Sequence, residues 1–238
     1  MNKNDFAKYV VLTAILSIGI ALAGYAIGGG FVESKLADRY VTVKGLAEKE
    51  ADADLAIWPI TFNVMSNGLS DIQGQVEENR VIIKEFLLKS GFEEKSVSYA
   101  APKIFDNEAD GYSNRVQQFR YRAQSTVTVR SDKVSLVKTS MEKSGALIGK
   151  GVVMAQNWEF PTEFIYTALN EIKPSMIEEA TKNARMAAEK FAMDSGSEVG
   201  KIRNATQGLF SIDNRDMNSP ERKVIRVVTT VQYYLVDN

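Results

Sequence analysis

The sequence contains neither cysteine nor histidine among its 238 residues. The absence of cysteine excludes disulfide bonds, thiol catalysis and thiolate metal sites, and it is compatible with an oxidising compartment. The absence of histidine excludes Ser-His-Asp and Cys-His catalysis as well as imidazole metal ligands. An enzyme with this sequence would therefore have to work with carboxylates, lysine, tyrosine or arginine.

A strong net charge is also absent. The 29 Lys and Arg residues and the 30 Asp and Glu residues give a formal net charge of −1. With 45% hydrophobic and 25% charged residues, the composition is that of an ordinary globular domain and not of a disordered chain. Nothing in this balance favours nucleic acid, so no nucleic-acid partner is predicted.

One long hydrophobic run is present, from Tyr9 to Val32, and it contains no charged side chain over 24 residues. About 20 apolar residues in a helix cross a bilayer core of about 30 Å. The run therefore predicts a transmembrane helix, with residues 1–35 forming a cytoplasmic stub and a signal anchor. A short basic N-terminus usually stays in the cytoplasm, which places residues 36–238 outside it.

A cleaved secretory signal is the alternative for the same run. Lys3 and Lys8 make a basic start, and Ala21-Leu22-Ala23 is an A-x-A cleavage site, so cleavage at Ala23 would release a soluble periplasmic protein. Apolar residues continue past this site, whereas a cleaved signal usually turns polar there. This continuation favours a retained anchor.

Hydrophobic periodicity predicts an α+β fold after the membrane run. From about residue 54 to 170 the predicted order is strand, helix, strand, strand, helix, strand, which is the βαββαβ order of ferredoxin-like domains. A second, βαββ-type lobe with long β-hairpins is predicted from residues 39–50 and 171–238. The predicted strands are Arg39–Lys44, Ala56–Val64, Val97–Phe105, Val116–Arg130, Val152–Trp158, Glu163–Asn170, Lys201–Ile212 and Lys223–Val236, and the predicted helices are Ser70–Lys89, Asp132–Ser144 and Pro174–Asp194. Ser70 is expected to cap the first helix and Gly91 to end it, and Phe191 is expected on the buried side of the last helix. One face of the second strand is expected to carry Ala56, Trp58, Ile60, Phe62 and Val64.

Several positions carry more specific expectations. Gly45 and the charged run Glu48–Asp54 predict a turn, and Pro59 predicts a strand edge or a bulge because proline cannot donate to a ladder. The 15-residue strand Val116–Arg130 would extend about 50 Å, with its arginines on a solvated face or at a subunit contact. The final strand has apolar side chains on both faces, which predicts subunit contacts in a symmetric ring.

Two groups of carboxylates are candidate sites. Glu48, Glu50, Asp52 and Asp54 alternate, so a hydrolase could use two of them, although a solvated strand edge accounts for them better. The run Asp106-Asn107-Glu108-Ala109-Asp110-Gly111 is similar to the opening of a calcium loop, but Gln117 stands where the loop needs a bidentate glutamate. No catalytic, cofactor-binding or metal site is therefore predicted.

Seven short segments are spread over nearly everything after Arg39: in order, Val41-Thr42-Val43-Lys44-Gly45, Ala53-Asp54-Leu55-Ala56, Lys89-Ser90-Gly91-Phe92, Tyr121-Arg122-Ala123, Asp132-Lys133-Val134, Ser144-Gly145-Ala146 and Ala180-Thr181-Lys182-Asn183-Ala184-Arg185. In this order they resemble the SIMPL-domain family. The resemblance implies a secreted or membrane-anchored bacterial envelope protein with α+β lobes, a tendency to form large homo-oligomers and a loose association with envelope or oxidative stress defence. It supplies no catalytic motif. Ala53, where the family often has proline, and the pair Trp58-Pro59 depart from the family pattern.

Together these features predict a non-enzymatic, single-pass protein of the bacterial inner membrane. Its domain would lie in the periplasm and self-assemble, so the predicted partners are further copies of itself and the lipid bilayer around residues 9–32. The alternative is a periplasmic hydrolase or ligand-binding module that works through carboxylates.

Overall fold

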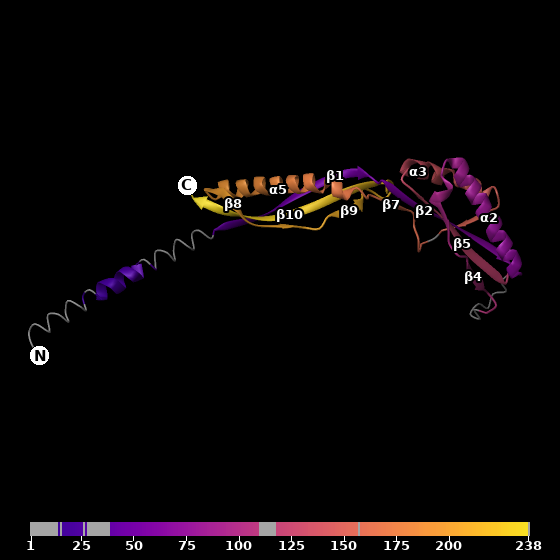
Figure 1. The fold of residues 1–238 in the computed structure, drawn as a ribbon, viewed down its shortest axis with the longest axis horizontal. Coiled ribbons are helices and arrows are strands. Elements are labelled where there is room, and N and C mark those ends of the chain that lie inside the picture. Colours follow the sequence, from indigo (N-terminus) through magenta and orange to yellow (C-terminus); the bar gives the residue numbers. More distant parts are fainter. Residues whose placement is uncertain are drawn as a thin grey trace, which may run out of the picture. The chain divides into compact units, whose positions relative to one another are not determined.

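The computed structural model describes residues 14, 16–25, 27, 39–109, 118–156 and 158–237 (Figure 1). These residues form a mixed α+β structure with two antiparallel sheets and several helices, as predicted for the fold class. The chain divides into two compact units. Unit 1 comprises Met1–Glu48, Pro174–Phe210 and Arg226–Asn238, and unit 2 comprises Lys49–Lys173 and Ser211–Ile225.

The hydrophobic run near the N-terminus is described only in part. Residues 16–25 are helical and their side chains are exposed. The helices in the described part of the chain include none with the length and hydropathy needed to cross a bilayer. The other half of the predicted span Tyr9–Val32 lies outside the described residues.

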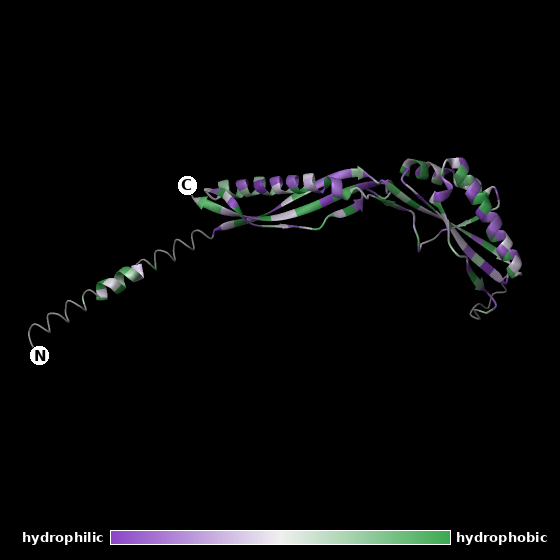
Figure 2. Cartoon of the chain, viewed as in Figure 1, coloured by the Kyte–Doolittle hydropathy of each residue, from purple (hydrophilic) through white to green (hydrophobic). Residues whose placement is uncertain are grey.

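Unit 1 is organised around a sheet with the strand order β1-β10-β8, in which β9 also pairs with β10. Helix α5 packs on this sheet through a stripe of small residues at intervals of four: Ala180, Ala184, Ala188 and Ala192 are all buried. Figure 2 shows hydrophilic and hydrophobic residues mixed along α5, as expected for a helix with one buried stripe. The elements of this sheet and its helix are β1 (Tyr40–Asp52), α5 (Leu169–Asp194), β8 (Ser197–Gln207), β9 (Ser211–Asn214) and β10 (Arg222–Asp237), of which β9 falls within the bounds of unit 2.

The predicted turn at Gly45 is wrong, because β1 continues through this residue. A Cβ atom at position 45 would lie 1.8 Å from the carbonyl oxygen of Ala180 and 2.5 Å from the amide nitrogen of Ala184. Glycine is therefore required here for close approach of strand and helix, which is a second common role of glycine inside strands.

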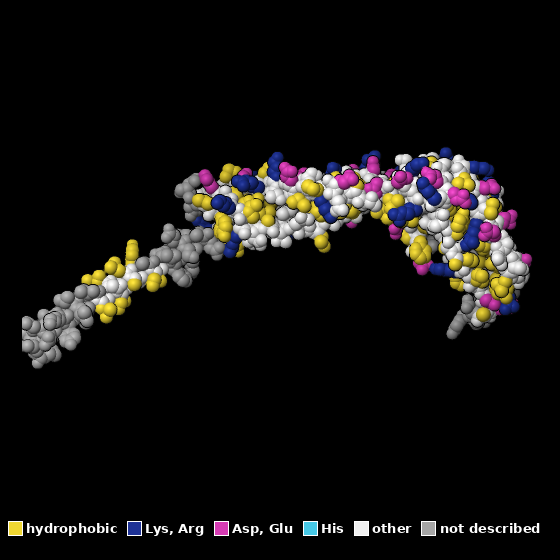
Figure 3. Space-filling model, in the orientation of Figure 1, with side chains coloured by type: hydrophobic (Ala, Val, Ile, Leu, Met, Phe, Trp, Pro, Cys, Tyr) yellow, Lys and Arg dark blue, Asp and Glu magenta, His cyan; other side chains and the backbone are white. Residues whose placement is uncertain are grey.

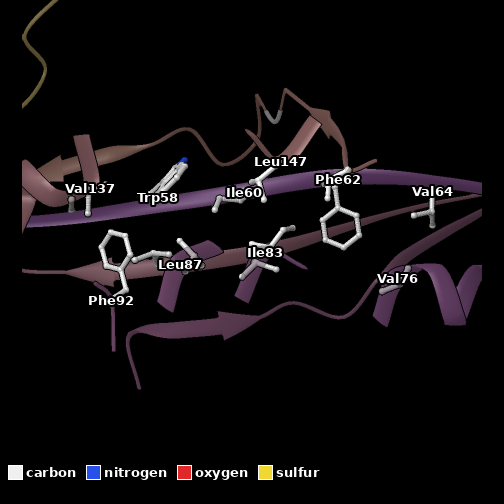
Figure 4. Packing of buried hydrophobic residues seen from close by; sticks show 14 of the residues in the cluster. Trp58, Ile60, Phe62, Val64, Val76, Ile83, Leu87, Phe92, Val137 and Leu147 are labelled. Carbon is white, nitrogen blue, oxygen red and sulfur yellow. The ribbon is translucent and has the colours of Figure 1, made fainter. Parts of the chain in front are cut away.

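Unit 2 contains a six-stranded sheet with the order β3-β5-β2-β6, in which β4 pairs with β5 and β7 pairs with β2. Its core lies between β2 and the helices, where Trp58, Ile60 and Phe62 of β2 meet Ile83 and Leu87 of α2 (Figure 4). The strands are β2 (Leu55–Ser66), β3 (Val97–Tyr99), β4 (Lys103–Asp106), β5 (Tyr121–Ser131), β6 (Val153–Ala155) and β7 (Glu163–Ile165). The helices are α2 (Leu69–Ser90), the 3₁₀ turn η1 (Glu94–Ser96), α3 (Val134–Lys143) and α4 (Gly145–Ile148).

Pro59 lies in a strand that has neighbours on both sides, so the prediction of a sheet edge is correct only at the position of Pro59 itself. Pairing of β2 with β5 is continuous through Pro59, which faces Thr128. On the other side of β2, β7 pairs with Leu55–Ile57 and β6 pairs with Thr61–Asn63. Pro59 falls in the gap between these two short strands, where no ladder hydrogen bond is needed from it.

Several predicted boundaries also differ from the structure. The predicted strand Val97–Phe105 is split into β3 and β4, with Pro102 between them, and β5 has 11 residues instead of 15. Helix α2 ends at Gly91 as predicted, whereas its N-cap is Gly68 and not Ser70. Helix α5 begins at Leu169, so Pro174 lies inside it, and Phe191, predicted to be buried, is 60% exposed.

Candidate functional site

The alternating carboxylates do not converge on a common site. Glu48, Glu50 and Asp52 are all exposed along β1. Two of them form only long ion pairs, Glu50 with Arg215 at 3.7 Å and Asp52 with Arg222 at 3.8 Å. Such exposed pairs contribute little, which agrees with a solvated strand edge.

Asp54 has a structural role. Its carboxylate oxygens accept hydrogen bonds from the backbone N–H groups of Thr167, at 2.8 and 2.9 Å, and of Ala168, at 3.0 Å. These groups directly precede α5, so Asp54 satisfies donors at the helix entrance, as a capping residue does.

Asp52 lines a cleft of about 350 Å³ in unit 2 together with Glu142, Glu221 and Lys138. The Lys138 ammonium group lies 2.5 Å from Oε1 of Glu221 and holds the pKa of that carboxyl below its usual range. Glu221 is therefore ionised at neutral pH and unsuited to donate a proton as a general acid.

Two carboxylates of the run that was compared with a calcium loop are engaged by an arginine. Arg120 forms ion pairs with Asp106 at 3.0 Å and with Glu108 at 3.2 Å, and its hydrogen bond lowers the pKa of Asp106. Asp110, Gly111 and Gln117 lie outside the described residues. Of the residues that the structure describes, no group of three or more Asp and Glu side chains is arranged to hold a metal ion.

A second cleft, of about 330 Å³, lies on the face of the unit 2 sheet that α2 does not cover. Ile57, Pro59, Thr126 and Thr128 form its floor, and Lys103 stands at its rim. Lys103 is 2.8 Å from Glu159 and 5.8 Å from the ring of Phe160, both in the segment between β6 and β7 that lines the cleft. No spacing pattern in the sequence marks this cleft, because its lining residues come from four separated segments.

The unit 1 sheet has two open edges. Strands β1 and β8 each pair with β10 on one side only, and no strand in the described part of the chain pairs with their outer sides. All residues of β8 from Lys201 to Gln207 are exposed. Hydrophobic side chains also reach the surface among the charged ones (Figure 3), including Ile202 at 50% exposure and Leu209, directly after β8, at 96%.

The final strand β10 is the central strand of this sheet, so both of its edges are paired within the chain. The subunit contacts expected from its apolar faces stay a prediction. One face of β10 is buried by Val227, Val231 and Tyr233, and the other face is half-buried within the same chain. On that second face the guanidinium group of Arg203 lies 4.0 Å from the ring of Tyr40 and 5.9 Å from that of Tyr234.

This arrangement of sheets and helices extends over the region that a family model matches. Residues 41–232 match the model described as SIMPL, a protein of unknown function (DUF541). The chain belongs to the SIMPL family. The match covers both units of the described structure, and it confirms the resemblance found in the sequence. No curated protein matches this SIMPL chain.

Proposed function

We propose that this SIMPL protein is a non-enzymatic, membrane-anchored envelope protein whose domain self-assembles into a ring in the bacterial periplasm. The proposal takes the hydrophobic run Tyr9–Val32 as a retained inner-membrane anchor and residues 36–238 as the assembling domain. A role in envelope or oxidative stress defence is part of the same proposal, and it rests only on what the family resemblance implies.

The observation that carries the assembly proposal is the pair of open edges in unit 1. Strands β1 and β8 have 13 and 11 residues, and they flank the same central strand on opposite sides. Long edges of this kind are rarely left uncovered, because their backbone groups are templates for pairing with another chain. Self-assembly would cover both.

The positions of the two edges permit a ring. If β8 of one copy lies beside β1 of the next, each contact joins two different surfaces, and such head-to-tail contacts generate a ring when the rotation closes. The exposed side chains of Ile202 and Leu209 would then be buried at every contact. Exposed apolar groups of this size next to an edge are typical of interaction surfaces.

The order β2, α2, β3 with β4, β5, α3 with α4, β6 in unit 2 further supports our interpretation of this unit as a ferredoxin-like lobe. A fold of this kind does not by itself imply an activity. The open carboxylates of β1 and the ionised Glu221 supply no acid–base pair, which is why we favour assembly over hydrolysis.

The test is the mass of the full-length protein in detergent, measured by light scattering after size exclusion. We expect a homo-oligomer for the natural sequence and a smaller species for the double variant Ile202→Lys with Leu209→Asp. Val81→Asp in α2 is the matched control, since Val81 is 48% exposed but lies in unit 2. A monomeric natural protein, or a double variant of unchanged mass, would overturn the proposal.

A further inference from the structure

Helix α2 carries one polar residue in its buried stripe. The buried residues are Ile72, Val76, Asn79, Ile83 and Leu87, and Asn79 is only 9% exposed. The carboxamide of Asn79 forms no hydrogen bond with any residue that the structure describes. The fully buried side-chain atoms without a partner in the described structure do not include those of Asn79, so its carboxamide reaches the surface of a cleft. Asparagine is a poor residue for a helix interior, and a polar residue that interrupts a buried stripe and faces a cleft points to a ligand.

Asn79 opens into a cleft of about 470 Å³ at the edge of the unit 2 core. Gln75, one helical turn earlier, presents a second carboxamide to the same cleft. Met65 and Val153 provide exposed apolar walls at 47% and 62% exposure. The charged residues at the cleft are Glu78 and Lys150, one of each sign and both exposed, so the cleft favours a neutral ligand.

The backbone next to this cleft is also open. Strand β2 pairs with β5 as far as Ser66, but with β6 only through Thr61–Asn63. Beyond Asn63, no described strand lies along this side of β2. The cleft therefore combines carboxamide side chains, an open strand edge and apolar walls.

We propose that this cleft binds a neutral ligand through a secondary amide group. The Asn79 carboxamide would donate a hydrogen bond to the ligand carbonyl and the Gln75 carboxamide would accept one from the ligand N–H, because these two groups point in opposite directions in a trans secondary amide. Peptides and N-acetylated sugars both carry this group, and a cleft of this volume lies in the range of small-molecule sites. The inference is independent of assembly and of membrane anchoring.

Binding can be followed through the side-chain amide signals of Asn79 and Gln75 in isotope-labelled full-length protein in detergent micelles. The probes are N-acetyl-alanyl-alanine amide as the peptide and N,N′-diacetylchitobiose as the N-acetylated sugar. Cellobiose, a disaccharide without an amide, is the control ligand. We expect at least one amide probe to shift both signals saturably, and the probe that does so identifies the source of the amide.

The variant Asn79→Leu separates a ligand site from a structural role. We expect it to raise the melting temperature, because leucine suits the buried stripe, and to weaken probe binding by about tenfold or more. Gln75→Ala, at a half-buried position, should weaken binding without loss of the fold, and Gln73→Leu, on the exposed face of α2, should leave it unchanged. The proposal is overturned if neither amide probe shifts these signals, if cellobiose binds as well, or if Asn79→Leu binds the probe with unchanged affinity.

Discussion

Substitution of Gly45 by alanine tests the packing of unit 1 most sharply. The added Cβ atom would lie 1.8 Å from the carbonyl oxygen of Ala180, whereas ordinary contacts of a Cβ atom begin at 3.4 Å. Strand β1 and helix α5 would have to move apart by roughly the difference between these two distances, because the contacted atoms of Ala180 and Ala184 belong to the backbone and no side chain can rotate away. Overpacking usually costs about 1–3 kcal/mol, and we expect Gly45→Ala to reach the upper end of that range, about 3 kcal/mol.

Gly74→Ala is the matched control. Position 74 lies in the exposed part of α2, and a Cβ atom there meets nothing within 4 Å. Because alanine is a better helix former than glycine, the free energy of unfolding of this variant should rise by roughly 0.5–1 kcal/mol.

Both variants can be compared with the natural protein by urea denaturation followed by circular dichroism. Tryptophan fluorescence adds a probe of unit 2, where both Trp58 and Trp158 lie. If the free energy of unfolding of Gly45→Ala lies within about 0.5 kcal/mol of that of the natural protein, the inferred close approach of β1 and α5 is contradicted.

Two further predictions concern polar groups of unit 2. Asp54→Ala should destabilise the protein by about 1–2 kcal/mol, as loss of a helix cap does, without affecting the oligomer mass measured by light scattering; a change below about 0.3 kcal/mol in urea denaturation would contradict the capping role. Burial lowers the pKa of Lys223, which is 8% exposed and hydrogen-bonded to Asn214. Between this lowered pKa and the value near 10.5 of the unfolded chain, the unfolded state binds more protons, so stability from this group rises with pH. Lys223→Met should therefore stabilise the protein at pH 7, and this gain should shrink towards pH 10.5; a gain that grows with pH in urea denaturation would refute the assignment.

The strand faces were predictable because they depend on a local period of two. Ala56, Trp58, Ile60, Phe62 and Val64 were expected on one face of β2, and all five are buried. Local signals also located the end of α2, where Gly91 adopts the left-handed conformation that such a cap requires.

Features that depend on neighbours distant in sequence were not predictable from one sequence. Glycine is typical of turns, so Gly45 was predicted to lie in one. Only the nearby backbone of Ala180 and Ala184 shows that this glycine allows β1 to contact α5. The place of β10 in the centre of its sheet depends on strand order, which the alternation of its residues does not encode. The role proposed for Asn79 could not be predicted from the sequence for the same reason, because it depends on the cleft that Asn79 lines and not on its position in the helix.

Cross-linking between the two open edges tests the central proposal most directly. The chain has no cysteine, so substitutions introduce unique thiols, and Lys44→Cys on β1 and Asn204→Cys on β8 both place one on an exposed residue. With a short bis-maleimide, the full-length double variant in detergent should give a ladder of covalent oligomers larger than dimers on a denaturing gel. Each single variant should stay uncrosslinked, because β1 of one copy meets β8 of the next. Dimers from either single variant, or no product from the double variant, would contradict the ring.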